Sequence, residues 1–376
     1  MPREAKEIPK PKRHRVSRRD ENSPKKHRRS VHILEPLTYS AEELDLLLAA
    51  YKVMFRARRT DEKAIVLYKQ NKAHFQIGVA GHEAVQVAAS QIFDVKKDWF
   101  YPYYRDMALC SGLGMTSQEF MLNVMNKRDD PNSHGRQMPM HYGSKRLRII
   151  SQSSPTGTQF LQAVGCALAS RKLGQDAVVY VSAGEGTCAQ GDFHEACNWA
   201  ARERLPVIFL IENNHFAISV PIEEQIAGRS VHKMSRGYTD LETIEIDGTD
   251  FWLSYESIRR AYRRAKDGLG PTLIEAHVPR LQSHSISDNH LKYRSSEEVS
   301  AQLDQCPIRK ARNILLENEA IEALELEKIE QEIISEIDQA ADWAEAQSDC
   351  LPEDADTYIF TDSTPWVGIN EHPADG

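Results

Sequence analysis

Short hydrophobic runs alternate with helical patterns through the middle of the chain, most clearly between Val178 and Asn214. Two β-branched or apolar runs, Val178–Ser182 and Val207–Ile211, flank a segment in which apolar residues recur at helical spacing. The recurring residues are Phe193, Ala196, Cys197, Ala200 and Ala201. A strand, a helix and a strand in this order predict two parallel strands of one sheet, joined by a crossover helix.

Helical and strand patterns continue on both sides of this unit. Ser40 and Glu43 have the spacing of a capping box, and the apolar period that follows predicts a long helix, or a pair of helices, up to about Asn71. A glycine-opened helix is expected from Gly78. The remaining predicted strands are Leu147–Ile150, Thr243–Gly248 and Thr272–Val278, and the remaining helices run from Phe160 to Leu168, over Tyr255–Lys266 and as a hairpin over 308–346. Strands that alternate with helices predict an α/β fold.

The length and composition of the chain indicate how large its core can be and where in the cell it is expected. The chain has 376 residues, 41% of them hydrophobic, so it can bury a large core. Its apolar runs are much shorter than the roughly 18 residues of a membrane span, and its N-terminus has no apolar signal core. We therefore expect no membrane association and a cytoplasmic or mitochondrial matrix location. The six cysteines form no CxxC pair and are expected to be free thiols.

The first thirty residues differ from the rest in charge. They carry 12 Lys and Arg against 4 Asp and Glu, whereas the whole chain has a net charge of −8. With four prolines and few apolar residues, residues 1–35 predict a disordered basic arm. An acidic partner or simple solubilisation explains this arm better than nucleic-acid binding. Its acidic residues and lack of amphipathic pattern also argue against a mitochondrial transit peptide.

Candidate chemistry begins at the polar turns after the two central strands, Gly184–Gly186 (GEG) and Glu212–Asn214 (ENN). Because ligands of open α/β sheets bind at the carboxyl ends of the strands, both turns should face one site. The Glu185 carboxylate and the Asn214 amide oxygen suit magnesium, which takes further oxygens from phosphate and water. The glycines and the following helix N-terminus favour a diphosphate. Either turn could also be an ordinary strand-end loop.

Three other segments carry candidate site residues. Tyr104 and Arg105, in FYPYYRD, offer donors to a diphosphate or form a surface cation–π pair. The hydroxyls of SQSSPTGTQ, Ser151–Gln159, either cap the next helix or bind a monovalent cation. His141, in HGRQMPMHYG, either lines a substrate pocket or stabilises its loop. His284 lies in a segment without regular period, Arg280–Tyr293, which predicts a functional loop after the last strand.

Taken together, these sequence motifs resemble those of a known family. GEG followed after 27 residues by NN resembles the thiamine diphosphate motif, usually GDG followed by NN. Five motifs occur in the order typical of the α subunit of the decarboxylating component of 2-oxo acid dehydrogenase complexes. They are YR, GRQMP-HYG, SSP–TQ, GEG–NN and HSxSD. The resemblance covers about residues 40–345. It implies a three-layer, parallel-sheet thiamine diphosphate-binding domain over 36–300, the C-terminal helical hairpin packed on it over 301–346, and an irregular tail over 347–376.

The resemblance also assigns roles to single residues. Magnesium would be held by Glu185, Asn214 and the main-chain carbonyl of Phe216. The cofactor would contact Tyr104, Arg105, Ser154, Thr156, Glu185, Gly186, Thr187, Asn214 and His284. In branched-chain members an SSP–TQ segment binds potassium, which places Ser153, Pro155, Thr158 and Gln159 on such an ion. Thr156 stands where that segment holds an apolar wedge under thiamine, and is a departure. His284 is the expected catalytic residue, and Ser285 and Ser295 match positions phosphorylated in mitochondrial relatives.

The function implied is oxidative decarboxylation of a 2-oxo acid and acyl transfer to the lipoyl domain of an acyltransferase core. Because the glutamate that activates thiamine lies on the β subunit in the family, an α2β2 heterotetramer is implied. SSP–TQ and NNxxAIS resemble branched-chain members, whereas Glu212 and Thr156 keep pyruvate and acetoin dehydrogenases as alternatives. A non-catalytic protein that has kept the fold is the alternative outside the enzymes.

Overall fold

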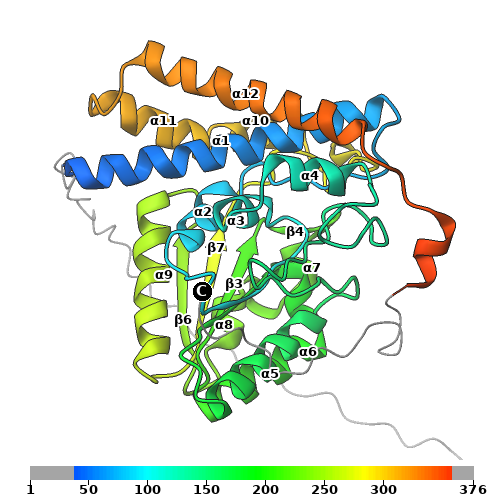
Figure 1. The fold of residues 1–376 in the computed structure, drawn as a ribbon. Coiled ribbons are helices and arrows are strands. Elements are labelled where there is room, and N and C mark those ends of the chain that lie inside the picture. The colour runs from blue at the N-terminus through cyan, green and yellow to red at the C-terminus, as the bar shows by residue number, and fades with distance from the viewer. Residues whose placement is uncertain (1–37, 358–376) are drawn as a thin grey trace, which may run out of the picture. The chain divides into compact units, whose positions relative to one another are not determined.

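A parallel sheet lies at the centre of the part of the chain that the computed structural model describes, residues 38–357 (Figure 1). Its five strands follow the order β1 (Trp99–Tyr101), β2 (Val179–Gly184), β3 (Val207–Asn213), β7 (Thr272–His277) and β6 (Glu242–Asp247). All neighbouring strands pair in parallel. The predicted α/β class and the parallel pairing of the two central strands are confirmed.

Side chains of the strands alternate between two hydrophobic clusters, one on each face of the sheet. Val179 and Val181 of β2 pack on α5 (Thr158–Lys172) and α6 (Gly191–Glu203). Tyr180, between them, belongs to the other cluster, with α2 (Glu83–Ser90), α3 (Met107–Gly112) and α9 (Phe251–Lys266). Both faces of a parallel sheet are buried in this way because the crossover helices cover them. Helices on both sides of the sheet give the predicted three layers.

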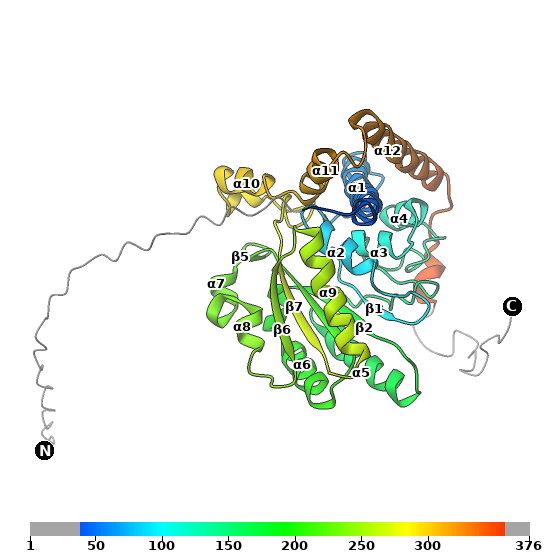
Figure 2. The same cartoon turned by 90° about the vertical axis from the view of Figure 1, so that its left-hand side faces the viewer.

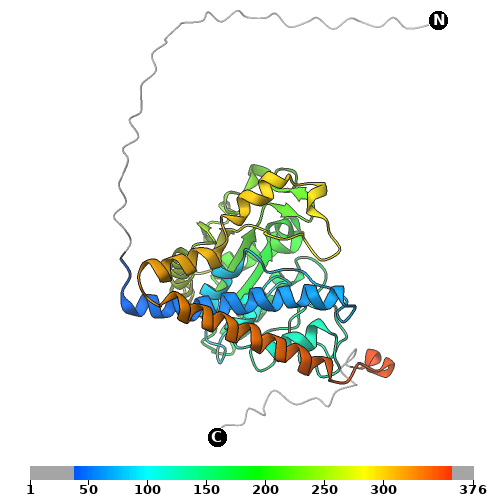
Figure 3. The same cartoon turned by 90° about the horizontal axis from the view of Figure 1, so that it is seen from above.

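Four further helices contribute apolar side chains to the cluster that contains Tyr180. They are α1 (Ala41–Lys69), α4 (Ser117–Val124), α11 (Pro307–Glu317) and α12 (Ala323–Glu345). α1 is a single helix that starts with the predicted capping box of Ser40 and Glu43. α1 and α12 lie side by side and run in the same direction (Figure 3), since Tyr51 bonds to Glu330 near their starts and Lys72 to Glu345 near their ends.

Several expected boundaries were wrong. The second helix begins at Glu83 and not at Gly78, because residues 76–82 form an irregular segment and turn. Leu147–Ile150 is not a strand; Ile149 makes only isolated bridges with Phe100 and Ser144. Strand β1 was not predicted, nor was α10 (Ser296–Leu303), which precedes α11 in the chain and lies to its left in Figure 2. The shorter elements are β4 (Phe216–Ala217), β5 (Val220–Pro221), α7 (Ile222–Gln225), α8 (Val231–Ser235) and 3-10 turns at Glu185–Ala189, Ala227–Arg229, His290–Lys292 and Pro352–Asp356.

Some expectations fall at or beyond the limits of residues 38–357. The predicted basic arm and most of the predicted tail lie outside them. All six cysteines lie inside, and all are free thiols as predicted. Of the helices described, none combines the length and the apolar character that crossing a membrane requires.

Candidate active site

A cavity of about 290 Å³ lies where the carboxyl ends of β1, β2, β3 and β7 come together. Each of these strands is followed by a turn that contributes to its wall, as expected at the carboxyl edge of a parallel sheet. The lining residues are Tyr103, Tyr104, Arg105, Thr156, Gly184, Glu185, Gly186, Thr187, Asn214, Phe216, Ala217, Ile218 and His284. Segments more than a hundred residues apart in sequence therefore share one site.

Glu185 is the buried carboxylate of this cavity. Its side chain has no exposed surface, and one oxygen, Oε2, accepts a hydrogen bond of 3.2 Å from the main-chain N–H of Asn214. The other oxygen, Oε1, is buried without a partner among the described residues. Burial raises the pKa of Glu185 to about 7, because solvent no longer stabilises its charge. A cation in the cavity would stabilise the charged form of this buried carboxylate.

Asn214 and Phe216 lie in a segment whose backbone turns sharply at two residues, one between them and one just after them. His215 and Ile218 adopt left-handed φ values of 70° and 57°. The Asn214 side-chain oxygen accepts from the main-chain N–H of Phe216 at 3.3 Å, which fixes the amide of a residue that is 4% exposed. Gly186 allows the neighbouring turn to approach, because a Cβ there would lie 2.6 Å from Ala217 Cβ. Residues of the two predicted metal-binding turns thus face one cavity.

Arg105 lies on the opposite wall and holds His284. Its guanidinium is nearly buried and donates to the main-chain oxygen of Gly78 at 2.7 Å. It also donates to His284 Nδ1 and to the His284 main-chain oxygen, both at 3.0 Å. The Tyr104 ring meets the His284 ring edge to face, with centroids 6.1 Å apart. Tyr104, Arg105 and His284, which come from two distant segments, therefore form one wall.

The bond to Arg105 fixes the state of His284. Since a guanidinium can only donate, Nδ1 must be an acceptor, and Nε2 carries the proton of the neutral ring. Burial, together with the positive charges of Arg105 and Arg280, lowers the pKa of His284 to about 3. His284 is therefore a neutral imidazole near pH 7. With Nδ1 occupied by Arg105, the ring can donate a hydrogen bond from Nε2.

Glu212 points away from the cavity, although it immediately precedes the asparagine turn. Its carboxylate is fully buried and bonds to His82 Nδ1 at 2.6 Å and to Gln86 Nε2 at 2.8 Å. Gln86 also donates to the main-chain oxygen of Arg105 at 3.1 Å. Burial lowers the pKa of His82, so this contact is a hydrogen bond of a neutral ring and not an ion pair. The carboxyl of Asp106 lies in the same network, and burial raises its pKa and that of Glu212. Glu212 thus supports the wall that Arg105 forms.

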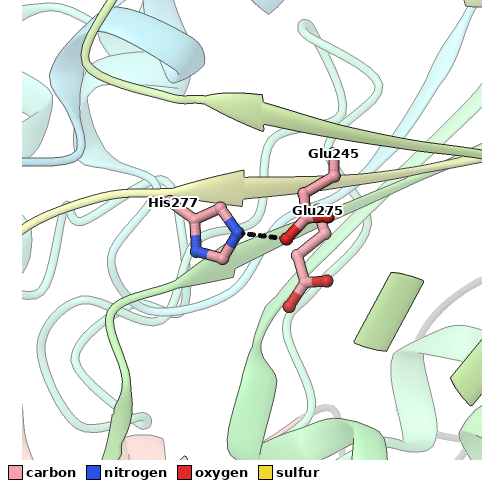
Figure 4. A group of neighbouring side chains, drawn as sticks. All are labelled: Glu245, Glu275 and His277. Atoms are coloured by element: carbon pink, nitrogen blue, oxygen red, sulfur yellow. Dashed lines mark hydrogen bonds and ion pairs between the residues drawn. The ribbon is translucent and has the colours of Figure 1, made fainter. Parts of the chain in front are cut away.

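A second group of metal-type side chains lies at the ends of β6 and β7 (Figure 4). His277 Nε2 is 2.8 Å from Glu245 Oε1, and Glu275 lies beside them. The other partners of Glu275 are Asn213 Nδ2, Ser230 Oγ and the main-chain N–H groups of Val231 and His232, at 2.7–3.1 Å. Four donors use all lone pairs of this carboxylate, which leaves none for a metal. Glu275 instead holds Asn213, the neighbour of Asn214.

The SQSSPTGTQ segment lies mostly outside the cavity. Of its predicted ligands, Thr156 lines the cavity wall, and Ser154 Oγ instead bonds to His141 Nε2 at 2.9 Å. The expected capping of the next helix by a hydroxyl was wrong: the N-cap of α5 is Gly157, with a φ of 95° and no side-chain cap. Thr158 Oγ1 donates to the Pro155 oxygen at 3.2 Å. Gln159 Nε2 donates to the Ser182 oxygen at 3.3 Å, and Ser153 is half-buried.

The cavity therefore brings together nine of the predicted site residues. They are Tyr104, Arg105, Thr156, Glu185, Gly186, Thr187, Asn214, Phe216 and His284. Ser153, Ser154, Pro155, Thr158, Gln159 and His141 are not among its lining residues. Sequence reasoning missed Tyr103, Ala217 and Ile218, each of which lies within or beside a recognised word. Their position next to predicted ligands was the available signal.

Comparison with known proteins supplies an independent view of the chain. The family model described as the dehydrogenase E1 component matches residues 51–353. The 2-oxoisovalerate dehydrogenase subunit alpha of Bacillus subtilis is 40% identical over 314 residues, which are 82% of this chain and 94% of that protein. The 3-methyl-2-oxobutanoate dehydrogenase subunit alpha of Mycobacterium tuberculosis is 34% identical over 68% of this chain and 67% of its own length. The human mitochondrial 2-oxoisovalerate dehydrogenase subunit alpha is 34% identical, and the match spans 72% of this chain and 60% of that protein.

Proposed function

Because the chain belongs to the dehydrogenase E1 component family, we propose that it is the α subunit of a branched-chain 2-oxo acid dehydrogenase. The observation that carries this proposal is the convergence of Arg105, Glu185, Asn214 and His284 on one cavity at the carboxyl edge of the sheet. The relatives named for 2-oxoisovalerate and 3-methyl-2-oxobutanoate support the substrate class.

The cavity fits thiamine diphosphate and magnesium. The unpartnered Glu185 Oε1 and the Asn214 amide oxygen are hard donors of the kind magnesium takes. The Phe216 main-chain oxygen completes the proposed protein ligands. On the opposite wall Arg105 and Tyr104 offer donors to phosphate oxygens, and Gly186 and Thr187 line the remaining side. Potassium on Ser153, Pro155, Thr158 and Gln159 and a cofactor contact at Ser154 remain further parts of the proposal.

In this proposal the residues of this chain bind and orient the cofactor and donate hydrogen bonds at the reacting atoms. Thiamine diphosphate, when bound, supplies the carbanion catalyst and electron sink for decarboxylation. Glu185 and Asn214 hold the cation that neutralises the diphosphate, and Arg105 holds the diphosphate from the other side. Phe216 and Ile218 add apolar surface to the cavity lining. Neutral His284 would donate a hydrogen bond from its Nε2–H to an oxygen that gains negative charge during acyl transfer.

The chain supplies only part of the machinery. In this proposal the β subunit adds the base that activates the cofactor, within an α2β2 heterotetramer, and the lipoyl acyltransferase core receives the acyl group. A cytoplasmic location, or the mitochondrial matrix in a eukaryote, goes with this assembly. Glu212, which resembles pyruvate-specific relatives, faces α2 and not the cavity, so its identity carries no weight for substrate choice. Thr156 does line the cavity and keeps pyruvate and acetoin as the alternative substrates.

The proposal is tested by reconstitution of the full chain with its β subunit, thiamine diphosphate and magnesium. A panel of 2-oxo acids is assayed by dye reduction, with 2-oxoisovalerate, 4-methyl-2-oxopentanoate and pyruvate as the main members. We expect turnover of the branched acids to exceed that of pyruvate at least tenfold. Activity confined to pyruvate would contradict the substrate. Failure to bind the cofactor even with the β subunit present would favour a non-catalytic protein that has kept the fold.

A further inference from the structure

The loop that carries His284 is fastened on both sides of this residue to one irregular segment, residues 76–80. The Leu281 N–H donates to the Ala80 oxygen at 3.1 Å, and the Ile286 N–H donates to the Gln76 oxygen at 2.9 Å. These two main-chain bonds bracket His284. Since residues 76–80 belong to neither a helix nor a strand, the position of His284 depends on whatever holds this segment in place.

A buried side chain of α1 holds that segment. The Gln76 side chain, 2% exposed, donates to the carboxylate of Asp61, which has no exposed surface. Asp61 lies in the third quarter of a helix of 29 residues, so its backbone is rigid. Arg105 adds a second bond to the segment at the Gly78 oxygen. Asp61 is thus the point where the outer helical layer reaches the residues around the cavity.

Gly78 brings Asp61 to the loop as well. A Cβ at Gly78 would lie 3.0 Å from Asp61 Oδ2 and closer still to Gln282 Oε1, so both oxygens lie over the bare glycine. Asp61 Oδ2 is buried and has no partner among the described residues. Either a proton on Asp61 or a reversed side-chain amide of Gln282 would join the two groups. Gln282 is two residues from His284.

The charges around Asp61 fit this arrangement. Burial raises the pKa of Asp61 to about 6, against the lowering effects of the Gln76 hydrogen bond and of Arg58. Glu83, which pairs with Arg58 at 2.6 Å, raises it as well, and Arg105 lowers it. An Asp61 carboxyl that retains its proton up to this range can donate to Gln282 Oε1.

We propose that Asp61 is a positioning residue for the His284 loop, through Gln76 and Gln282. Its effect on catalysis rests on the proposed function, but its effect on the loop does not. Without the Asp61 carboxyl, residues 76–80 lose their side-chain anchor. The bonds at Leu281 and Ile286 then open more often, and His284 leaves its place beside Arg105 and Tyr104.

Amide hydrogen exchange of the full chain tests this directly, at a temperature well below unfolding. In Asp61→Ala we expect exchange at Leu281 and Ile286 to rise at least tenfold. Asp61→Asn should restore protection to within threefold of the native chain, because its amide can accept from Gln76 and donate to Gln282. Asp98→Ala is the matched control: Asp98 is equally buried, but its bonds to Val178, Asp94 and Tyr262 lie elsewhere.

The outcomes separate a positioning role from general destabilisation. Equal protection of residues 281–286 in Asp61→Ala and Asp98→Ala would overturn the proposal, as would a failure of Asp61→Asn to restore protection. In the reconstituted complex, Asp61→Ala should lower kcat at least tenfold and leave the KM for the 2-oxo acid within twofold. If the native complex has no activity, the exchange result still stands or falls by itself.

Discussion

At the scale of single residues, surroundings decide what each polar side chain of the cavity can do. Glu185 directly follows β2 and Glu212 lies near the end of β3, and both are fully buried carboxylates. Each has one oxygen without a partner among the described residues, but only Glu185 lines the cavity, whereas Glu212 Oε2 bonds to His82 and Gln86. The first is therefore available for a cation, and the second belongs to the scaffold.

Replacement of Glu185 by glutamine tests its availability for a cation. The change keeps the shape of the side chain and removes its charge, so magnesium loses an anionic ligand. We expect magnesium-dependent binding of thiamine diphosphate to weaken by more than the roughly 10- to 100-fold that loss of an outer-shell partner costs. Calorimetric titration of the reconstituted complex measures this. Glu223→Gln, an exposed change on the nearby helix α7, should leave the affinity within twofold.

His284 makes a prediction about pH. Its folded pKa of about 3 lies below the value of about 6.5 expected in the unfolded chain, so the folded state binds fewer protons between these values. Stability from this group is complete above pH 6.5 and is lost as the pH falls towards 3, by at most about 1.4 kcal/mol per pH unit.

Urea unfolding between pH 7.5 and 5 measures this contribution. The His284→Gln variant should lose less stability over this range than the native chain does. An unchanged slope would contradict the neutral, buried state of the imidazole. His74→Gln, at an exposed position on the segment after α1, should behave like the native chain.

Residue identities in the site could be predicted further than their directions. The GEG, NN, YR and HSxSD words placed Glu185, Asn214, Arg105 and His284, because each lies in a turn at a strand end. The sequence alone does not show towards which neighbouring element the side chain of a strand residue points. The contact of Glu212 with α2 could therefore not be predicted from its position. Asp61 is one polar residue within a helical pattern, and only the fold reveals that it reaches Gln76.

At the scale of elements, turns after four strands meet because the strands are parallel and in close register. Gly184 of β2 pairs with Glu212 of β3, so the two predicted metal-binding turns start at the same level of the sheet. Buried strands with two apolar faces were predictable from their β-branched runs. β1 was not, because WFY is three residues long and leads directly into a functional turn. The start of α2 was missed because residues 76–82 take their shape from distant partners.

Gly186→Ala tests how closely the turn after β2 and the strand β4 must approach. The new Cβ would meet Ala217 Cβ at 2.6 Å and Gln225 Oε1 at 3.0 Å. We expect the free energy of unfolding in urea to fall by about 1–3 kcal/mol, as for other overpacked sites. Addition of Ala217→Gly should recover much of the loss. Gly191→Ala, where nothing lies within 4 Å, should cost nothing; a comparable loss there would indicate a general effect of alanine.

At the scale of the whole described unit, the sheet and its site lie under an outer layer built from both ends of the sequence. α1 packs between the inner helices and the pair formed by α11 and α12. The C-terminal hairpin was predictable from its period, but its parallel course beside α1 was not. Which helices meet depends on packing between residues far apart in sequence. The apolar spacing within either helix does not determine that choice.

Two leucines of α12 test how much this layer contributes. Leu326 has no exposed surface, whereas Leu324, two residues earlier, is 81% exposed. Leu326→Ala should lower the free energy of unfolding by about 2–5 kcal/mol, since it leaves a cavity against the core. Leu324→Ala should stay within about 0.5 kcal/mol of the native chain. Equal effects in urea titrations would show that α12 does not pack on the core as described.

The pairing of α1 with α12 also sets the order of events during synthesis. Tyr51 and Glu330 are 279 positions apart, so the apolar side of α1 leaves the ribosome long before its partner exists. At translation rates of about 5–20 residues per second, that delay is roughly 15 to 55 s. Throughout it the side of α1 that carries Tyr51 lacks the cover that α12 later provides. This part of the core therefore stays incomplete until the last long helix has been made.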